Sequence, residues 1–178
     1  QKQAKDVWEE FCKQILKMER SSETSEVVEE NNAEILTQSV LELNITEPFV
    51  DLLVTSPPYV TSYEYADIHQ LSTLWLDYSP DYKHFRTGSI GSLYHSCDLR
   101  FNVPKLNQSG LTVVMQMYSV DKKQAKAIAQ YYVNMQEVVK KICNIVKKGG
   151  ACLFVIGNTE YKNVKIDNAR HLAESLLN

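Results

Sequence analysis

A chain of 178 residues is long enough for one domain with a hydrophobic core, and its hydrophobic content of 44% is ordinary for a globular protein. Its first residues lack the charged, apolar, small-residue order of a signal peptide, it has no run of about 18 apolar residues, and its four cysteines lack paired spacing, so we expect a cytoplasmic protein without membrane span, zinc site or disulfide framework. Residues 1–51 hold 12 acidic and 5 basic side chains, whereas residues 52–178 hold 10 and 14, and this basic excess permits contact with nucleic-acid phosphates.

Residues 4–19 are predicted to form an amphipathic helix, because apolar side chains recur there at intervals of three and four. The stripe predicts a helix that faces a core, and it consists of Ala4, Val7, Trp8, Phe11, Ile15 and Met18. Residues 20–32 are polar and acidic, which is typical of a mobile surface connection. We therefore expect residues 1–32 to be a helix with an acidic linker, and residues 33–178 to form the second part of the protein.

The second part begins with a predicted short strand at residues 33–37, followed by a turn and short helix at 38–43. Residues 49–54 are an apolar run that predicts a buried strand, and this strand leads directly into Thr55-Ser56-Pro57-Pro58-Tyr59. The two prolines fix φ and donate no backbone N–H, and Pro57 favours an extended conformation at Ser56. The sequence therefore predicts a stiff loop at the carboxyl end of a strand, where open α/β sheets bind ligands.

This five-residue segment resembles the catalytic motif of the S-adenosylmethionine-dependent amino-methyltransferases, which methylate exocyclic amines of nucleic-acid bases. The Thr-Ser-Pro-Pro-Tyr form is most similar to the cytosine-N4 branch of the DNA enzymes, since adenine-N6 enzymes more often carry Asp or Asn at the position of Ser56. The resemblance implies methylation of a DNA base flipped out of the duplex, in a restriction-modification context. An adenine-N6 enzyme, an RNA base methyltransferase and a non-catalytic methyltransferase-like subunit remain open alternatives.

The chemistry of such an enzyme gives the loop residues their expected roles. The Ser56 side chain and the Pro57 carbonyl are candidate acceptors for the amine hydrogens, in a frame stiffened by Pro58. The Tyr59 ring is the candidate stacking surface for the flipped base. Candidate substrate-binding residues beside the loop are Thr55, Tyr63 and Tyr65, with core packing as the alternative for each of the last two.

The cofactor side of the site has a weaker counterpart in this sequence. In the resembling family, the strand end before the catalytic strand commonly reads Gly-Asp-Ser, and the Asp contacts the adenine ring of the cofactor. Gln38 and Ser39 occupy that place here, and the resemblance implies that they bind the cofactor. Gln38 can hydrogen-bond an adenine amine, although a polar turn residue is the equally simple interpretation.

The remaining elements follow in chain order. Residues 63–78 predict a helix, on which Glu64, Asp67 and His69 do not share one face, so we expect no metal site. Residues 79–110 show no period and predict an irregular substrate-side loop. Residues 121–148 predict a long basic helix ended by Gly149-Gly150, residues 151–156 a parallel strand buried on both faces, and residues 167–177 a helix with Asp167 as its N-cap.

This order of elements predicts an α/β protein: part of a Rossmann-like methyltransferase fold, with a mostly parallel sheet flanked by helices. The resemblance covers roughly residues 33–160 and omits the cofactor half, because no Phe-x-Gly-x-Gly loop follows a strand. In the family's sheet, two strands that carry the cofactor motifs lie between the counterparts of residues 33–37 and 49–54. We therefore expect strand 49–54 to lack one neighbour, and another segment of the same protein or a second chain to supply it.

Overall fold

The computed structural model describes residues 6–23, 34–36, 38–45, 47–60, 63–78, 81, 85–86, 89–94 and 97–177. The chain divides into two units, residues 1–37 and 38–178. The described part of the first unit contains helix α1 (Val7–Glu23), which begins where the Asp6 carboxylate accepts a hydrogen bond from the Trp8 N–H at 2.9 Å. The expected N-terminal helix is therefore confirmed from Val7 onward.

Two expectations for the first unit are wrong in its described residues. The apolar stripe of α1 does not face a core within its unit, since Trp8 is 71% exposed and Phe11 51% exposed. Residues 34–36 form no strand, because no neighbouring strand in the described part of the chain pairs with them. Residues 20–23 of the expected linker belong to α1, and residues 24–32 lie outside the described residues.

The second unit is built around helix α7 (Lys122–Ile145), which the sequence predicted. Helix α6 (Gln108–Val120), which the sequence did not predict, and helix α8 (Asn168–Leu177) both pack against α7. Asp167 begins α8 as expected, with its carboxylate accepting from the Arg170 N–H at 3.1 Å. The buried core between these helices includes Val114, Met117, Ile128, Tyr132, Val139 and Leu172.

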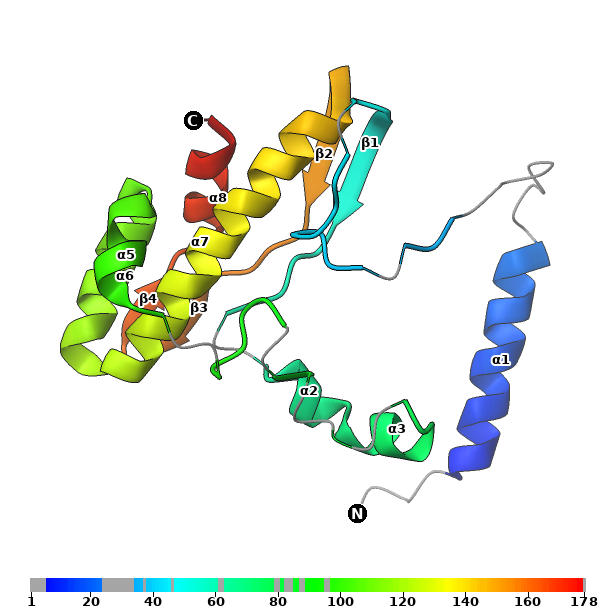
Figure 1. Ribbon diagram of the computed structural model, residues 1–178. Coiled ribbons are helices and arrows are strands. Elements are labelled where there is room, and N and C mark those ends of the chain that lie inside the picture. Colours follow the sequence, from blue (N-terminus) through cyan, green and yellow to red (C-terminus); the bar gives the residue numbers. More distant parts are fainter. Residues whose placement is uncertain are drawn as a thin grey trace. The chain divides into compact units, whose positions relative to one another are not determined.

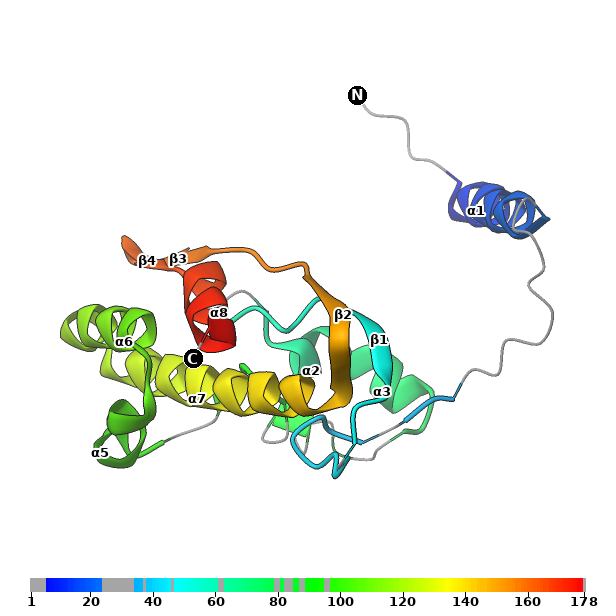
Figure 2. The ribbon, with the colours of Figure 1, turned by 90° about the horizontal axis from the view of Figure 1, so that it is seen from above.

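Strands β1 (Val50–Thr55) and β2 (Val146–Phe154) form a two-stranded parallel sheet, and α7 is the last helix of the connection between them (Figures 1 and 2). Val54 pairs with Leu153 and Thr55 with Phe154. The protein is thus a mixed α/β protein with a parallel strand pair. Among the described residues, β1 pairs with β2 only.

The boundary between α7 and β2 differs from the sequence prediction. The helix ends at Ile145, and Gly149 and Gly150 lie inside β2 rather than ending the helix. Gly149 has a φ of +82°, a left-handed conformation that favours glycine, and it lies where the register against β1 shifts. A bulge, not a helix stop, therefore accounts for the glycine pair.

The parallel sheet is covered on one face only, so the expectation that residues 151–156 are buried on both faces is wrong. Leu53 and Phe154 pack against the core that α7 carries. On the opposite face Val54 remains 61% exposed and Leu153 55% exposed. Parallel sheets are normally buried on both faces, whereas this pair of strands has one open face in the described structure.

The described elements that precede α6 are short, apart from α1 and β1. Helices α2 (Tyr65–Ile68) and α3 (Gln70–Trp75) replace the single helix expected at residues 63–78. Residues 40–42 form a turn, and residues 38–43 contain no helix. Helix α5 (Leu99–Asn102) and the 3₁₀ helix η1 (Val103–Lys105) occupy part of the stretch predicted to be irregular.

A hairpin precedes α8, formed by the antiparallel strands β3 (Thr159–Tyr161) and β4 (Val164–Ile166). Its two turn residues, Lys162 and Asn163, both have positive φ, as tight hairpin turns require.

None of the described helices combines the length and the apolar character that crossing a membrane requires.

Candidate functional site

The segment Thr55-Ser56-Pro57-Pro58-Tyr59 leaves the carboxyl end of β1 beside the carboxyl end of β2. The Val155 N–H donates to the Thr55 carbonyl at 2.9 Å, which extends the strand pairing by one residue. The Ser56 hydroxyl then donates to the Val155 carbonyl at 3.0 Å. Because that bond uses the hydroxyl proton, the oxygen lone pairs are the remaining hydrogen-bonding capacity of the Ser56 side chain.

The proline pair is held from the other side by α7. The Tyr131 hydroxyl, on a side chain that is 1% exposed, donates to the Pro58 carbonyl at 2.8 Å. Two residues later, the Val60 carbonyl accepts from the Thr159 hydroxyl at 3.3 Å. The Pro57 carbonyl lies between these fixed points and accepts no hydrogen bond from the described residues. Contacts on both sides therefore fix the part of the loop that carries the Ser56 hydroxyl and the Pro57 carbonyl.

Burial also keeps Tyr131 in its donor form. Burial raises the pKa of the Tyr131 hydroxyl well above its ordinary value, and the neighbouring Tyr65 and Tyr59 raise it further. The hydroxyl, which even an ordinary tyrosine keeps protonated at neutral pH, therefore remains a donor to the Pro58 carbonyl at alkaline pH as well. Sequence reasoning missed this residue, because Tyr131 lies 73 positions after Pro58 and falls within the apolar pattern of a helix.

A groove of about 520 Å³ opens beside the loop, and we call it the loop groove. It brings together residues from four segments: the turn after the first unit, the loop itself, the start of α2, and the stretch around residue 90. Lys141 steadies the first of these by donating to the Leu43 carbonyl at 2.6 Å. The loop groove is lined by Ser39, Val40, Ser56, Pro58, Tyr65, Ser89 and Ile90.

Four residues predicted from the sequence thus lie in one place, namely Ser39, Ser56, Pro58 and Tyr65. The other predicted site residues do not line the loop groove. Pro57 is buried, while Thr55 and Tyr59 are half-buried next to it. Gln38 is exposed, and the exposed Tyr63 has its ring centre 6.1 Å from that of Tyr65.

The segment around residue 90 supplies lining residues that the sequence placed only in a general substrate-side loop. Gly91, with a φ of +90°, brings its backbone against Tyr131 and Pro58. The Glu64 carboxylate accepts from the Ser92 hydroxyl and from the Leu93 N–H, each at 3.1 Å. One wall of the loop groove is therefore tied to the start of α2.

A second, more aromatic pocket of about 510 Å³ adjoins the loop groove, and the two share Tyr65 and Ser89. Its other lining residues are Ala66, His69, Thr73, Tyr78 and Phe85. Beside it, Asp67 pairs with Arg86 at 2.6 Å. The acidic side chains of α2 thus anchor the neighbouring loop, and no group of three metal-ligating side chains occurs among the described residues.

Two adjacent tyrosines of α7 provide a test of how the loop is held. Tyr131→Phe is expected to lower the free energy of unfolding by about 1 kcal/mol, because the bond to Pro58 is lost. Tyr132→Phe is expected to have no cost or to stabilise, because the buried Tyr132 hydroxyl has no hydrogen-bond partner in the described part of the chain. Urea unfolding of both variants measures the difference. Equal losses would show that the bond to Pro58 contributes nothing specific.

Comparison of the chain with protein-family models, with curated proteins and with solved structures returned no match. The interpretation of the site therefore depends on the residues and contacts described above.

Proposed function

We propose that the chain is the catalytic part of an S-adenosylmethionine-dependent DNA amino-methyltransferase, with cytosine N4 as the favoured target atom. The observation that carries the proposal is the arrangement at the end of β1. The Ser56 hydroxyl donates a hydrogen bond to the Val155 carbonyl, and the adjacent Pro57 carbonyl accepts no hydrogen bond within the described residues. Two neighbouring residues of a loop that is fixed on both sides therefore carry oxygens with unused lone pairs.

Two acceptors suit an exocyclic base amine. The lone pair of such an amine is delocalised into the ring, which makes the nitrogen a poor nucleophile. Hydrogen bonds from its two hydrogens to Ser56 and Pro57 would localise that lone pair on the nitrogen. Acceptors that are already in position need no reorganisation during the reaction, and the two prolines and the Tyr131 bond provide that rigidity.

The surroundings of the loop suit a planar base. Tyr65 lines the loop groove, and the centre of the Tyr63 ring lies 6.1 Å from that of Tyr65. Tyr59 directly follows Pro58, which also lines the groove. A base extruded from a duplex is held by stacking on aromatic rings, which these tyrosines can supply. In this proposal Tyr59 is the stacking residue, with Thr55, Tyr63 and Tyr65 at the substrate side.

The described residues provide only part of a site for S-adenosylmethionine, the methyl donor in this proposal. Ser39 and Ser56 both line the loop groove, but no carboxylate that could bind ribose hydroxyls or the amino group lines it. Gln38 is exposed and does not line the groove. The chain by itself therefore does not fit the whole cofactor.

The open edge and open face of the β1–β2 sheet support a further segment as the source of the missing contacts to the cofactor. The outer edge of β1 has no partner among the described residues, and the apolar face formed by Val54 and Leu153 is open. We propose that another segment of the same protein, or a second chain, pairs with this edge and carries the cofactor-binding loop. An unpaired, apolar strand edge is the kind of edge that proteins otherwise protect.

The experiment that tests the proposal is to purify the chain with the polypeptides that accompany it in its native cells and to assay methyl transfer. The assembly would be incubated with S-adenosylmethionine and either DNA or RNA, and the nucleic acid digested to nucleosides for mass spectrometry. We expect N4-methylcytosine from DNA. N6-methyladenine or a methylated ribonucleoside would identify one of the enzymatic alternatives instead. An assembly that binds DNA but yields no methylated nucleoside would identify a non-catalytic subunit.

A further inference from the structure

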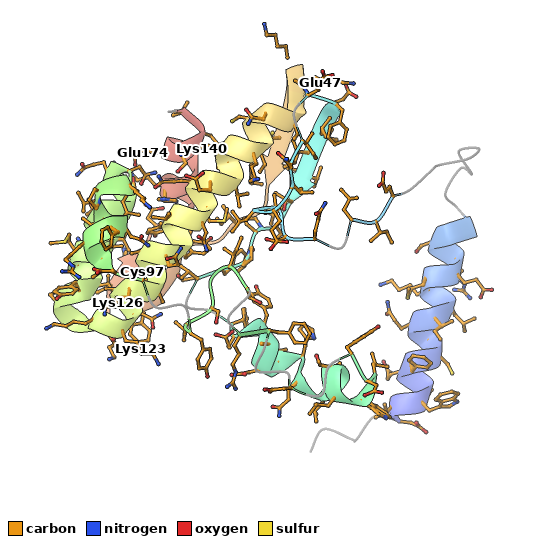
Figure 3. The ribbon with its side chains drawn as sticks, viewed as in Figure 1. Glu47, Cys97, Lys123, Lys126, Lys140 and Glu174 are labelled. Carbon is orange, nitrogen blue, oxygen red and sulfur yellow. The ribbon has the colours of Figure 1, made fainter. Side chains whose placement is uncertain are left out.

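The N-terminal end of α7 carries a concentration of positive charge next to the loop groove. Lys122, Lys123 and Lys126 lie in its first two turns and are exposed. Figure 3 shows Lys123 and Lys126 together at this end of the helix, away from Lys140 near the other end. We call these three lysines, with Arg86 of the neighbouring loop, the basic patch.

These lysines occupy an unfavourable place in their own helix. The N-terminus of a helix carries partial positive charge, so acidic residues are the favoured ones there. The first turn of α7 contains no acidic residue. Lysines at such positions do not serve helix stability, and departures from local preference often mark functional sites.

The acidic groups near the patch are already engaged. Asp121 caps α7 by accepting from the Lys123 and Gln124 N–H groups at 3.1 Å, and its other oxygen pairs with Lys162 at 3.0 Å. The pKa of Asp121 is held below its ordinary value, first by the N–H of Gln124 and then by Lys162.

The two other carboxylates of this region are also engaged in ion pairs. Asp98 pairs with Arg100 and Asp67 pairs with Arg86, each at 2.6 Å. Lys122, Lys123 and Lys126 form no ion pair with any described residue, which leaves a surplus of three charges.

Aromatic rings are interleaved with the cations. The Tyr94 ring contacts cations from two segments. The Arg86 guanidinium lies 4.6 Å from the centre of the ring, and the Lys123 ammonium of α7 lies 5.9 Å from it. The Lys122 ammonium lies 5.4 Å from the centre of the Tyr118 ring. These contacts hold the lysine side chains along the surface rather than leaving them fully free, which reduces the entropy lost on binding.

One chain segment connects the basic patch with the loop groove. Ser89 and Ile90 line the groove, and Tyr94, whose ring contacts Arg86 and Lys123, follows Ile90 by four residues. Arg86 joins the patch to α2 through Asp67, two residues after the groove-lining Tyr65. A polymer with one of its units bound in the loop groove would therefore pass over these cations.

We propose that the basic patch binds the phosphodiester backbone of DNA next to the base that occupies the loop groove. The inference rests on the proposed function, and it adds a second contact surface on α7. A row of lysines without acidic partners matches a regularly spaced polyanion, and Lys122 and Lys126 stand about 6 Å apart along the helix axis. The interleaved rings and the adjacent groove favour nucleic acid over a membrane surface.

The test is to measure binding of a fluorescent 20-base-pair DNA duplex by anisotropy at several salt concentrations. The proteins are the full chain and its Lys122→Gln, Lys123→Gln, Lys126→Gln triple variant. Each phosphate contact contributes about 0.9 to the slope of log affinity against log salt. We therefore expect the triple variant to reduce the magnitude of that slope by about 2 to 3. Gln and Lys have similar helix propensities, so the helix is expected to survive, and thermal unfolding verifies this.

A matched control removes the same charge elsewhere, through Lys140→Gln, Lys147→Gln and Lys148→Gln. The control is expected to keep a slope close to that of the unchanged chain. An equal loss in both triple variants, no DNA binding by the unchanged chain, or equal binding of polyglutamate would each overturn the inference. A loss confined to the α7 variant supports it even if no methylated nucleoside is formed, in which case the catalytic proposal alone fails.

Discussion

Replacing Ser56 by alanine is expected to lower methyl transfer by the complete assembly about 100-fold to 1,000-fold, the usual effect of deleting one preorganised polar group at a reacting centre. The Ser56 oxygen is one of the two acceptors proposed for the amine, and alanine removes it without adding volume. Since the side chain is exposed and makes a single hydrogen bond, to Val155, the fold is expected to tolerate the change. Initial rates by nucleoside mass spectrometry, together with a thermal unfolding curve, measure the two effects separately.

Ser89 provides the matched control, because it lines the same groove and its hydroxyl donates to the Phe85 carbonyl at 2.9 Å. Ser89→Ala removes the same atom from the groove but not from the proposed reacting centre, so its rate should stay within a few-fold of the unchanged protein. Tyr59→Ala should also abolish transfer while leaving the fold intact. If transfer survives both Ser56→Ala and Tyr59→Ala, the assignment of the site to this loop is wrong.

Some elements of the fold followed from local pattern and others did not. Helix α7 and strand β1 were predictable, because a sustained helical period and an apolar run before a proline pair each have one simple interpretation. Helix α6 contains Thr112, Val113 and Val114, whose β-branched side chains do not favour helices. It forms because its buried face packs on α7, and such tertiary contacts override local preference.

The candidate site, like the fold, could be predicted from the sequence only in part. The stiff loop could be recognised from its prolines, and Ser39, Ser56 and Tyr65 lie around one groove beside it. The hydrogen bonds that fix the loop could not be recognised, because Val155 and Tyr131 come from segments 99 and 73 residues away. Contacts between such distant segments depend on the complete fold and leave no periodic signal in the sequence.

Acid is expected to destabilise the second unit through His171, with a loss of about 2.5 kcal/mol between pH 7.5 and pH 4.5 from this group alone. Burial lowers the pKa of His171 from its ordinary 6.5 to about 4, against a smaller opposing effect of Glu174. Between these two pH values the unfolded chain binds the proton and the folded chain does not. Stability is therefore complete above about pH 6.5 and falls as the pH drops toward 4.

The surroundings of His171 explain why the neutral ring is favoured. The ring is 1% exposed and stacks on Tyr132 with ring centres 3.9 Å apart. Its Nε2 lies 3.2 Å from the Gln136 side-chain oxygen, which also accepts from the Asn107 N–H. A protonated ring would place a charge in this apolar contact without a carboxylate bonded to it, because Glu174 is engaged with the N–H groups at the start of α6.

Urea unfolding at pH 7.5 and pH 4.5 measures this loss, and His171→Gln isolates the contribution of the ring. Glutamine keeps an N–H donor near Gln136 but cannot be protonated, so this variant should lose about 2.5 kcal/mol less than the unchanged chain over the same interval. His69→Gln is the matched control, since His69 is exposed in the turn between α2 and α3, and it should keep the full loss. If His171→Gln and the unchanged chain lose the same stability, the buried histidine is not the source of the acid sensitivity in this interval, because carboxylates whose pKa values are lowered, such as Asp98, Asp121 and Glu174, lose their contribution mainly at lower pH.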